Sequence, residues 1–224
     1  VMSQTLYLIY TIAYSVLLLY GTRLLRRQFH ASTALLLIVT FGVFYDNLIL
    51  TVGNRLGAGD FLWALSVPRF VLHQLALPWI IYAGYDQARQ AGQGWAQARA
   101  ARWAAIALSA LVMGAGILTR LVGLHLEPEV MDGVLRYVAM GVSGPPIVSI
   151  VSIGLVGVAG LLFWRQNRWP WIFLAAVAVF VGESLPDESL RRAVGSALEV
   201  LFMAVLFFTQ LRLDEGKLPG MPRS

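Results

Sequence analysis

The chain has 224 residues, of which 58% are hydrophobic and 13% charged, and its formal net charge at pH 7 is +5. Ordinary soluble domains carry roughly 25% charged residues, so a soluble fold would leave too much apolar surface in water. The absence of cysteine excludes disulfides and thiolate chemistry, and the single lysine, Lys217 near the C-terminus, excludes a retinal Schiff base within a membrane.

Seven apolar segments follow one another along the chain. About 20 apolar residues cross the hydrocarbon core as a helix, because lipid offers no hydrogen-bond partner to exposed backbone groups. The runs are continuously apolar, whereas barrel strands alternate. We predict an all-α integral membrane protein with one domain, residues 1–213, and a short cytoplasmic tail, residues 214–224. The seven transmembrane helices are expected at residues 3–22, 33–53, 61–85, 103–123, 144–164, 169–185 and 190–212.

Basic residues are distributed unevenly between the two sets of loops. The loops after the first, third, fifth and seventh segments hold 11 basic and three acidic residues, whereas the other loops hold four basic and seven acidic residues. The positive-inside rule therefore predicts an N-terminus outside and a C-terminus in the cytoplasm. The basic loops suit anionic lipid head groups, so membrane lipids and not nucleic acid are the expected partners. Arginine used in place of lysine indicates a GC-rich bacterial genome, and hence a bacterial inner membrane.

Ionisable residues within the apolar segments form the candidate site, because buried charges in membranes usually face a bundle interior or a cavity. Arg69 and His73 lie one helical turn apart and share a face of the third helix. Asp46, on the preceding helix, is expected to pair with Arg69 and leave His73 free as a base or ligand. We assign catalytic roles to His73 and Asp46. The expected ligand-binding residues are Arg69, Asn47, Arg120, Glu183 and Glu199.

All of these side chains are expected on the outer side of the bilayer midplane, and no comparable group is expected in the inner half. A purely structural alternative is that the polar residues only hold the helices together, as intramembrane polar contacts commonly do. One sequence does not distinguish such a clamp from a pocket.

Two prolines flank Arg69 and His73 in the segment PRFVLHQLALPW, residues 68–79. Each proline removes a backbone donor and bends or begins a helix. We expect Pro68 to begin the membrane helix after a short interfacial segment, and Pro78 to bend it.

The segment 127–143 lies between the fourth and fifth apolar segments. Its apolar residues at positions 130, 131, 134, 135 and 138 make one helical face. We predict a helix there, either lying flat at the outer interface or forming the first turns of the fifth transmembrane helix.

The segment GVSGPP, residues 141–146, resembles the GxSG motif of rhomboid intramembrane serine proteases. In that family the serine needs a histidine base on a later helix, and no histidine follows His125. Gly144, Pro145 and Pro146 fit the entry to a helix better than a protease motif.

The expected topology also resembles that of intramembrane metal hydrolases of the alkaline ceramidase and adiponectin receptor type. Those families hold zinc with three histidines, whereas His30, His73 and His125 of this chain fall at different depths. A mixed site of His73 with Asp46, Glu183 or Glu199 stays open, since zinc accepts carboxylate oxygens. No metal site is assigned, and the cofactor is unknown.

Three functions are compatible with these residues. The first is a site in the outer half of the bilayer that binds a lipid or a small amphipathic ligand, with His73 as the general base if hydrolysis occurs. The second is a non-enzymatic accessory or assembly subunit of a larger membrane complex, in which protein partners cover apolar helix faces and His73 ligates a tetrapyrrole. The third is a small transporter, which the lack of an inverted repeat disfavours.

Overall fold

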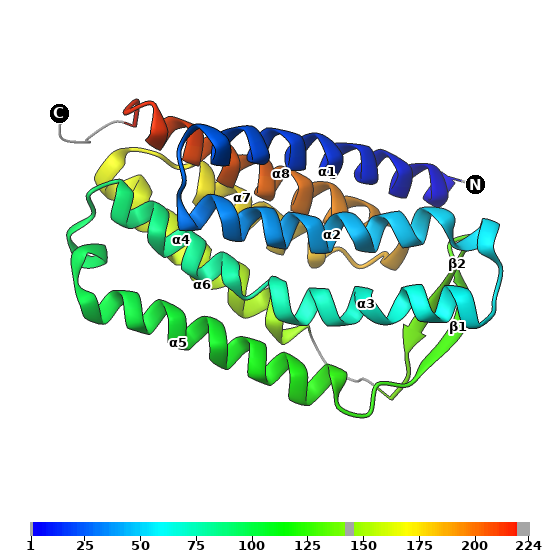
Figure 1. The fold of residues 1–224 in the computed structure, drawn as a ribbon. Coiled ribbons are helices and arrows are strands. Elements are labelled where there is room, and N and C mark those ends of the chain that lie inside the picture. The colour runs from blue at the N-terminus through cyan, green and yellow to red at the C-terminus, as the bar shows by residue number, and fades with distance from the viewer. Residues whose placement is uncertain (1, 142–145, 219–224) are drawn as a thin grey trace.

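The computed structural model describes residues 2–141 and 146–218 and consists mainly of long helices packed side by side (Figure 1). The elements up to the first strand are α1 (Met2–Arg27), α2 (Ala31–Leu56), α3 (Asp60–Ala76), α4 (Trp79–Gln90), η1 (Gly94–Gln97), α5 (Arg99–Gly116) and η2 (Ile117–Leu121). The remaining elements are β1 (Leu126–Met131), β2 (Val134–Ala139), α6 (Ile147–Asn167), α7 (Trp171–Glu183) and α8 (Glu188–Asp214).

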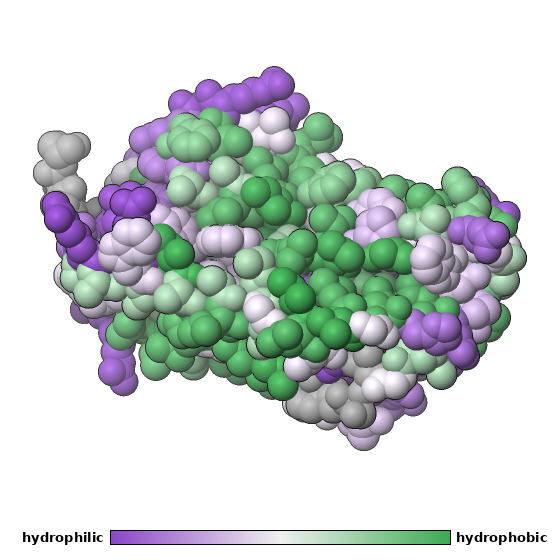
Figure 2. Space-filling model, turned by 60° about the horizontal axis from the view of Figure 1, so that its bottom comes forward, coloured by the Kyte–Doolittle hydropathy of each residue, from purple (hydrophilic) through white to green (hydrophobic). Residues whose placement is uncertain are grey.

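Within the described residues, six helical stretches are long and apolar enough to cross a membrane, counting α3 with α4 and α5 with η2 as continuous. The expected apolar segments match helices to within a few residues, but α7 has only 13 residues. At 1.5 Å per residue it rises about 20 Å, less than the hydrocarbon thickness of about 30 Å. Figure 2 shows apolar side chains across the middle of one face and hydrophilic ones at both ends.

The two prolines of the third apolar segment behave differently from each other. Pro78 lies at the break between α3 and α4, as expected. Pro68 does not begin a helix, because α3 starts at Asp60 and continues through it. The missing donor of Pro68 weakens one turn of α3, and in that turn the Tyr45 hydroxyl donates a hydrogen bond of 2.9 Å to the carbonyl of Leu65.

The prediction of a helix over residues 127–143 is wrong. β1 and β2 form an antiparallel hairpin with Met131 opposite Val134. The two residues between them, Asp132 and Gly133, have φ angles of 51° and 76°. An Asp-Gly pair with positive φ at both positions is the preferred two-residue hairpin turn, and it outweighs the helical spacing of the apolar residues.

The hairpin is attached to the turn between α2 and α3. The Tyr137 hydroxyl accepts a hydrogen bond of 3.1 Å from the Gly59 N–H, and the Asn54 side chain donates one of 2.7 Å to the carbonyl of Gly133. Gly53 allows this approach, because a Cβ atom there would collide with the carbonyl of Leu135. We call this end of the bundle the hairpin end. The other end, where the chain turns from the last residues of α1 into the start of α2, is called the opposite end (Figure 1).

Candidate functional site

Two cavities, each of about 230 Å³, lie at the hairpin end. Asp46 of α2 and Arg69 and His73 of α3 line both of them. The first cavity continues toward η2 and the start of α6, and the second continues toward the hairpin and α8. The three shared side chains therefore stand between two spaces that are each large enough for part of a ligand.

The expected pairing of Asp46 with Arg69 is confirmed. Arg69 Nε donates a hydrogen bond of 2.7 Å to Asp46 Oδ1. The Arg69 side chain is only 8% exposed, and its Nη1 has no partner among the described residues. A buried guanidinium donor without a partner is costly, and a bound anion would satisfy it.

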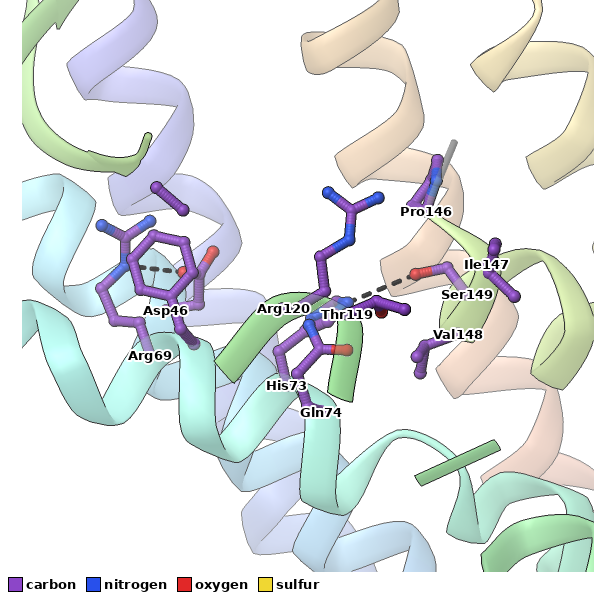
Figure 3. Close-up of a pocket in the computed structure, with 12 residues that line it drawn as sticks. Asp46, Arg69, His73, Gln74, Thr119, Arg120, Pro146, Ile147, Val148 and Ser149 are labelled. Carbon is purple, nitrogen blue, oxygen red and sulfur yellow. Dashed lines mark hydrogen bonds and ion pairs between the residues drawn. The ribbon is translucent and has the colours of Figure 1, made fainter. Parts of the chain in front are cut away.

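His73 faces α6 and not a carboxylate. Its Nε2 lies 3.3 Å from the Ser149 hydroxyl (Figure 3). Asp46 is engaged with Arg69, so it is not hydrogen-bonded to His73 as an orienting carboxylate would be. Asp46 therefore acts on His73 through the electrostatic field of its carboxylate, and both side chains line the same cavities.

The other expected ligand-binding residues are divided between the two cavities. Arg120 lines the first cavity from η2, a π-helical turn of the kind often found at functional sites. Asn47, Glu183 and Glu199 line the second cavity, from α2, α7 and α8 respectively. Asn47 is buried, and its Oδ1 has no partner among the described residues.

Arg136 and Ser149 are among the side chains of this site that the sequence did not predict. Arg136, expected in a loop or at an interface, reaches the second cavity from β2, where its guanidinium lies 5.7 Å from the centre of the Tyr7 ring. The Asp-Gly turn could have predicted this strand. No local signal marks Ser149, because its neighbour His73 is 76 residues away along the chain.

An ion pair also connects the hairpin to α8. Arg192 Nε donates a hydrogen bond of 2.9 Å to Asp132 Oδ2, and Arg192 Nη2 lies 2.8 Å from the same oxygen as an ion pair. Hydrogen bonding to Arg192 lowers the pKa of Asp132 below its ordinary value. Both residues line another cavity, of about 240 Å³, between the hairpin, α1 and α8.

In the described ranges 2–141 and 146–218, no three His, Cys, Asp or Glu side chains are grouped closely enough to hold a metal ion. A mixed site of His73 with carboxylates therefore lacks a third ligand among these residues. Ser143 of the GxSG segment lies outside the described residues.

The opposite end contains a second buried polar group. Asp86 is 3% exposed and Gln210 is fully buried. We give the name Asp86 cluster to five of the residues joined there by hydrogen bonds, which are Ser32, Asp86, Arg89, Gln90 and Gln210. In the sequence Asp86 directly follows the third apolar segment, which ends at residue 85, but α4 continues to Gln90 and Asp86 is buried within it.

No protein-family model matches this sequence, and no curated protein is significantly similar to it.

Proposed function

We propose that the protein binds an anionic lipid or small amphipathic molecule in the cavities at the hairpin end. The observation that carries the proposal is the buried Arg69 guanidinium, which lines both cavities and has one donor satisfied by Asp46 and another, Nη1, without a partner. Arginine binds phosphate and carboxylate groups through two parallel hydrogen bonds. The ligand's anion would lie on Arg69, and its apolar part would lie along the cavity walls.

The composition of the cavity walls supports an amphipathic ligand. Arg120 supplies further positive charge in the first cavity, and Phe70, Ile147 and Val148 supply apolar surface. In the second cavity, Arg136, Arg191 and Arg192 lie beside Tyr7 and Leu50. A fully polar solute would make no apolar contacts with the hydrophobic walls, and a neutral hydrocarbon would leave the Arg69 guanidinium without a hydrogen-bond acceptor.

The proposal places the protein in a bacterial inner membrane with seven spans and the hairpin end outside. Six helices of sufficient length and the arginine-rich opposite end support this arrangement. The seven-span arrangement requires α7, which packs against α6 and α8, to cross the membrane as a short seventh helix. Exposed tryptophans near helix ends fit interfacial anchors, and they are Trp63, Trp95, Trp103, Trp164 and Trp171.

The binding test compares Arg69→Gln with the unaltered protein. Both are incorporated into nanodiscs of neutral lipid, and a single-chain phosphate lipid is titrated in while binding is measured by native mass spectrometry. Loss of a charge-assisted hydrogen bond is worth about 1.5–3 kcal/mol, so we expect affinity to fall about 10- to 100-fold. Equal affinity in the two proteins would contradict the proposal.

Arg55→Gln is the matched control. Arg55 lies at the hairpin end of α2, is exposed and lines neither cavity. Arg55→Gln removes the same charge as Arg69→Gln, so any loss of lipid affinity caused only by a changed surface potential would occur in both variants. We expect Arg55→Gln to bind like the unaltered protein.

The topology is tested by single cysteines, because the chain has none of its own. Asp60→Cys at the hairpin end and Gln97→Cys at the opposite end are exposed to a membrane-impermeant maleimide on intact cells. We expect only the first to be labelled before lysis. The reverse pattern would contradict the orientation.

The alternative role of an accessory subunit makes a different prediction. If His73 ligates a tetrapyrrole, the purified protein should show a Soret-type absorbance band that is lost in His73→Ala. A colourless protein that copurifies with lipid would favour the binding function.

A further inference from the structure

Ser149 and His73 meet across the first cavity although they belong to distant parts of the chain. Ser149 lies in the first turn of α6, and His73 lies in α3. The distance of 3.3 Å from Oγ to Nε2 is long for a hydrogen bond, but catalytic pairs are often loose without substrate. Both side chains line the cavity, so a ligand there can contact both (Figure 3).

The contact of Ser149 differs from those of three other hydroxyl groups near the cavity or in the neighbouring helices. Ser66, Ser109 and Thr119 each donate to the carbonyl four residues earlier in their own helix. Ser149 instead meets a group on another helix that can accept its proton. An imidazole beside a serine hydroxyl is the arrangement that activates serine as a nucleophile.

The start of α6 adds a place for developing negative charge. The helix begins after Pro146, whose side chain offers no capping acceptor to the first-turn N–H groups. Val148 and Ser149 line the cavity at this position. First-turn N–H groups and the positive end of the helix dipole stabilise an oxyanion.

We propose that Ser149 and His73 form a nucleophile and base pair that hydrolyses a carboxylic ester in an anionic amphiphile. This inference rests on the proposed function, because Arg69 and Arg120 on the same cavity would hold the substrate's anionic group. Phe70 and Ile147 supply the apolar surface against which the acyl chain would lie.

The reaction has two balanced halves. Ser149 Oγ attacks the ester carbonyl while its proton passes to His73 Nε2, and collapse of the tetrahedral intermediate breaks the ester C–O bond. The alcohol leaves with the proton from His73, and an acyl-serine remains. Water then attacks the acyl-serine with His73 as base, which releases the carboxylic acid and restores the Ser149 hydroxyl.

The first experiment treats the unaltered protein in nanodiscs with a fluorophosphonate probe and maps the modified residue by peptide mass spectrometry. We expect the label on Ser149. Labelling of another residue, or no labelling, would overturn the assignment, and this measurement does not depend on whether a variant folds.

The second experiment measures fatty acid release from 1-oleoyl-glycerol-3-phosphate. We expect Ser149→Ala to abolish release and His73→Gln to lower it at least 100-fold. The matched control is Ser152→Ala, since Ser152 lies three residues further along α6 and is fully buried. It should keep both labelling and release.

Lipid binding separates the failure of this inference from the failure of the proposed function. If the unaltered protein binds the phosphate lipid in an Arg69-dependent manner but neither reacts nor releases fatty acid, the catalytic pair is wrong and the binding site stands. If Ser149→Ala binds normally and is inactive, both are supported. If the unaltered protein does not bind the lipid, the proposed function itself is wrong.

Discussion

The two ends of the bundle each pair an aspartate with an arginine, but Asp86 is the buried partner at the opposite end and Arg69 is the buried partner at the hairpin end. At the opposite end, the Asp86 carboxylate accepts hydrogen bonds from the Ser32 N–H, from the Gln90 amide and from two nitrogens of Arg89. At the hairpin end, Asp46 is joined to Arg69 through one nitrogen, and the Asp46 side chain is 34% exposed.

The difference separates a structural polar group from a candidate binding group. Hydrogen bonds on both oxygens occupy the acceptor capacity of Asp86, so its cluster holds α2, α4 and α8 together. Around Arg69, the atoms Arg69 Nη1, Asn47 Oδ1 and Gln74 Oε1 are buried without partners in the part of the chain that the structure describes. None of the five residues of the Asp86 cluster has such an atom, although Gln87 Oε1 and Asp214 Oδ2 beside the cluster do. A buried polar network that is only partly satisfied is costly, and a ligand can supply the missing partners.

The largest expected effect is in Asp86→Ala, which tests whether the opposite end is structural. Removing this carboxylate leaves the buried Ser32 N–H and the Gln90 amide without their acceptor, so we expect a loss of about 3 kcal/mol in unfolding free energy. The measurement is thermal unfolding in detergent followed by tryptophan fluorescence. Phosphate lipid binding at the hairpin end should be retained when assayed well below the lowered melting temperature.

Gly53→Ala tests whether the hairpin must approach α2 closely. The added Cβ meets the backbone carbonyl of Leu135, which cannot move without the hairpin, so we expect a loss of about 2 kcal/mol. Gly114→Ala is the matched control, because a Cβ on Gly114 of α5 meets nothing within 4 Å. It should leave stability unchanged or raise it by about 0.5–1 kcal/mol. Equal melting temperatures for the two variants would disprove the close approach.

Asp46→Asn should separate stability from binding. The amide oxygen still accepts a hydrogen bond from Arg69 and the site is partly exposed, so we expect a loss of about 1 kcal/mol or less. Without the competing carboxylate, Arg69 should bind the phosphate lipid more tightly. Destabilisation as large as that of Asp86→Ala would instead make both ends structural.

The smallest effect concerns acid pH and the attachment of the hairpin. The pKa of Asp132 is lowered in the folded protein by Arg192, so this contact contributes fully above the ordinary carboxyl pKa of about 3.9 and is lost as the pH falls below it. Hydrogen exchange of the hairpin amides should therefore rise on acidification below about pH 4. Asp132→Asn, which keeps a residue tolerant of positive φ, should remove this pH dependence. An unchanged acid response in Asp132→Asn would assign it to another group.

The sequence by itself determined the helical segments and the central ion pair. Length and hydropathy are local properties, and they located every long helix, because an apolar run of about 20 residues is compatible with few other structures. The pairing of Asp46 with Arg69 was predictable since consecutive helices joined by a short turn are usually neighbours.

Only the tertiary structure decided what surrounds that pair. The Asp-Gly turn is a local signal for the hairpin, but the position of Arg136 in the second cavity depends on how that hairpin packs against the helices. The contact of Ser149 with His73 depends on how α6 packs beside α3, which no local pattern records. Likewise, Asp86 is buried because α2, α4 and α8 converge on it, so its depth follows from packing and not from its place at the edge of an apolar segment.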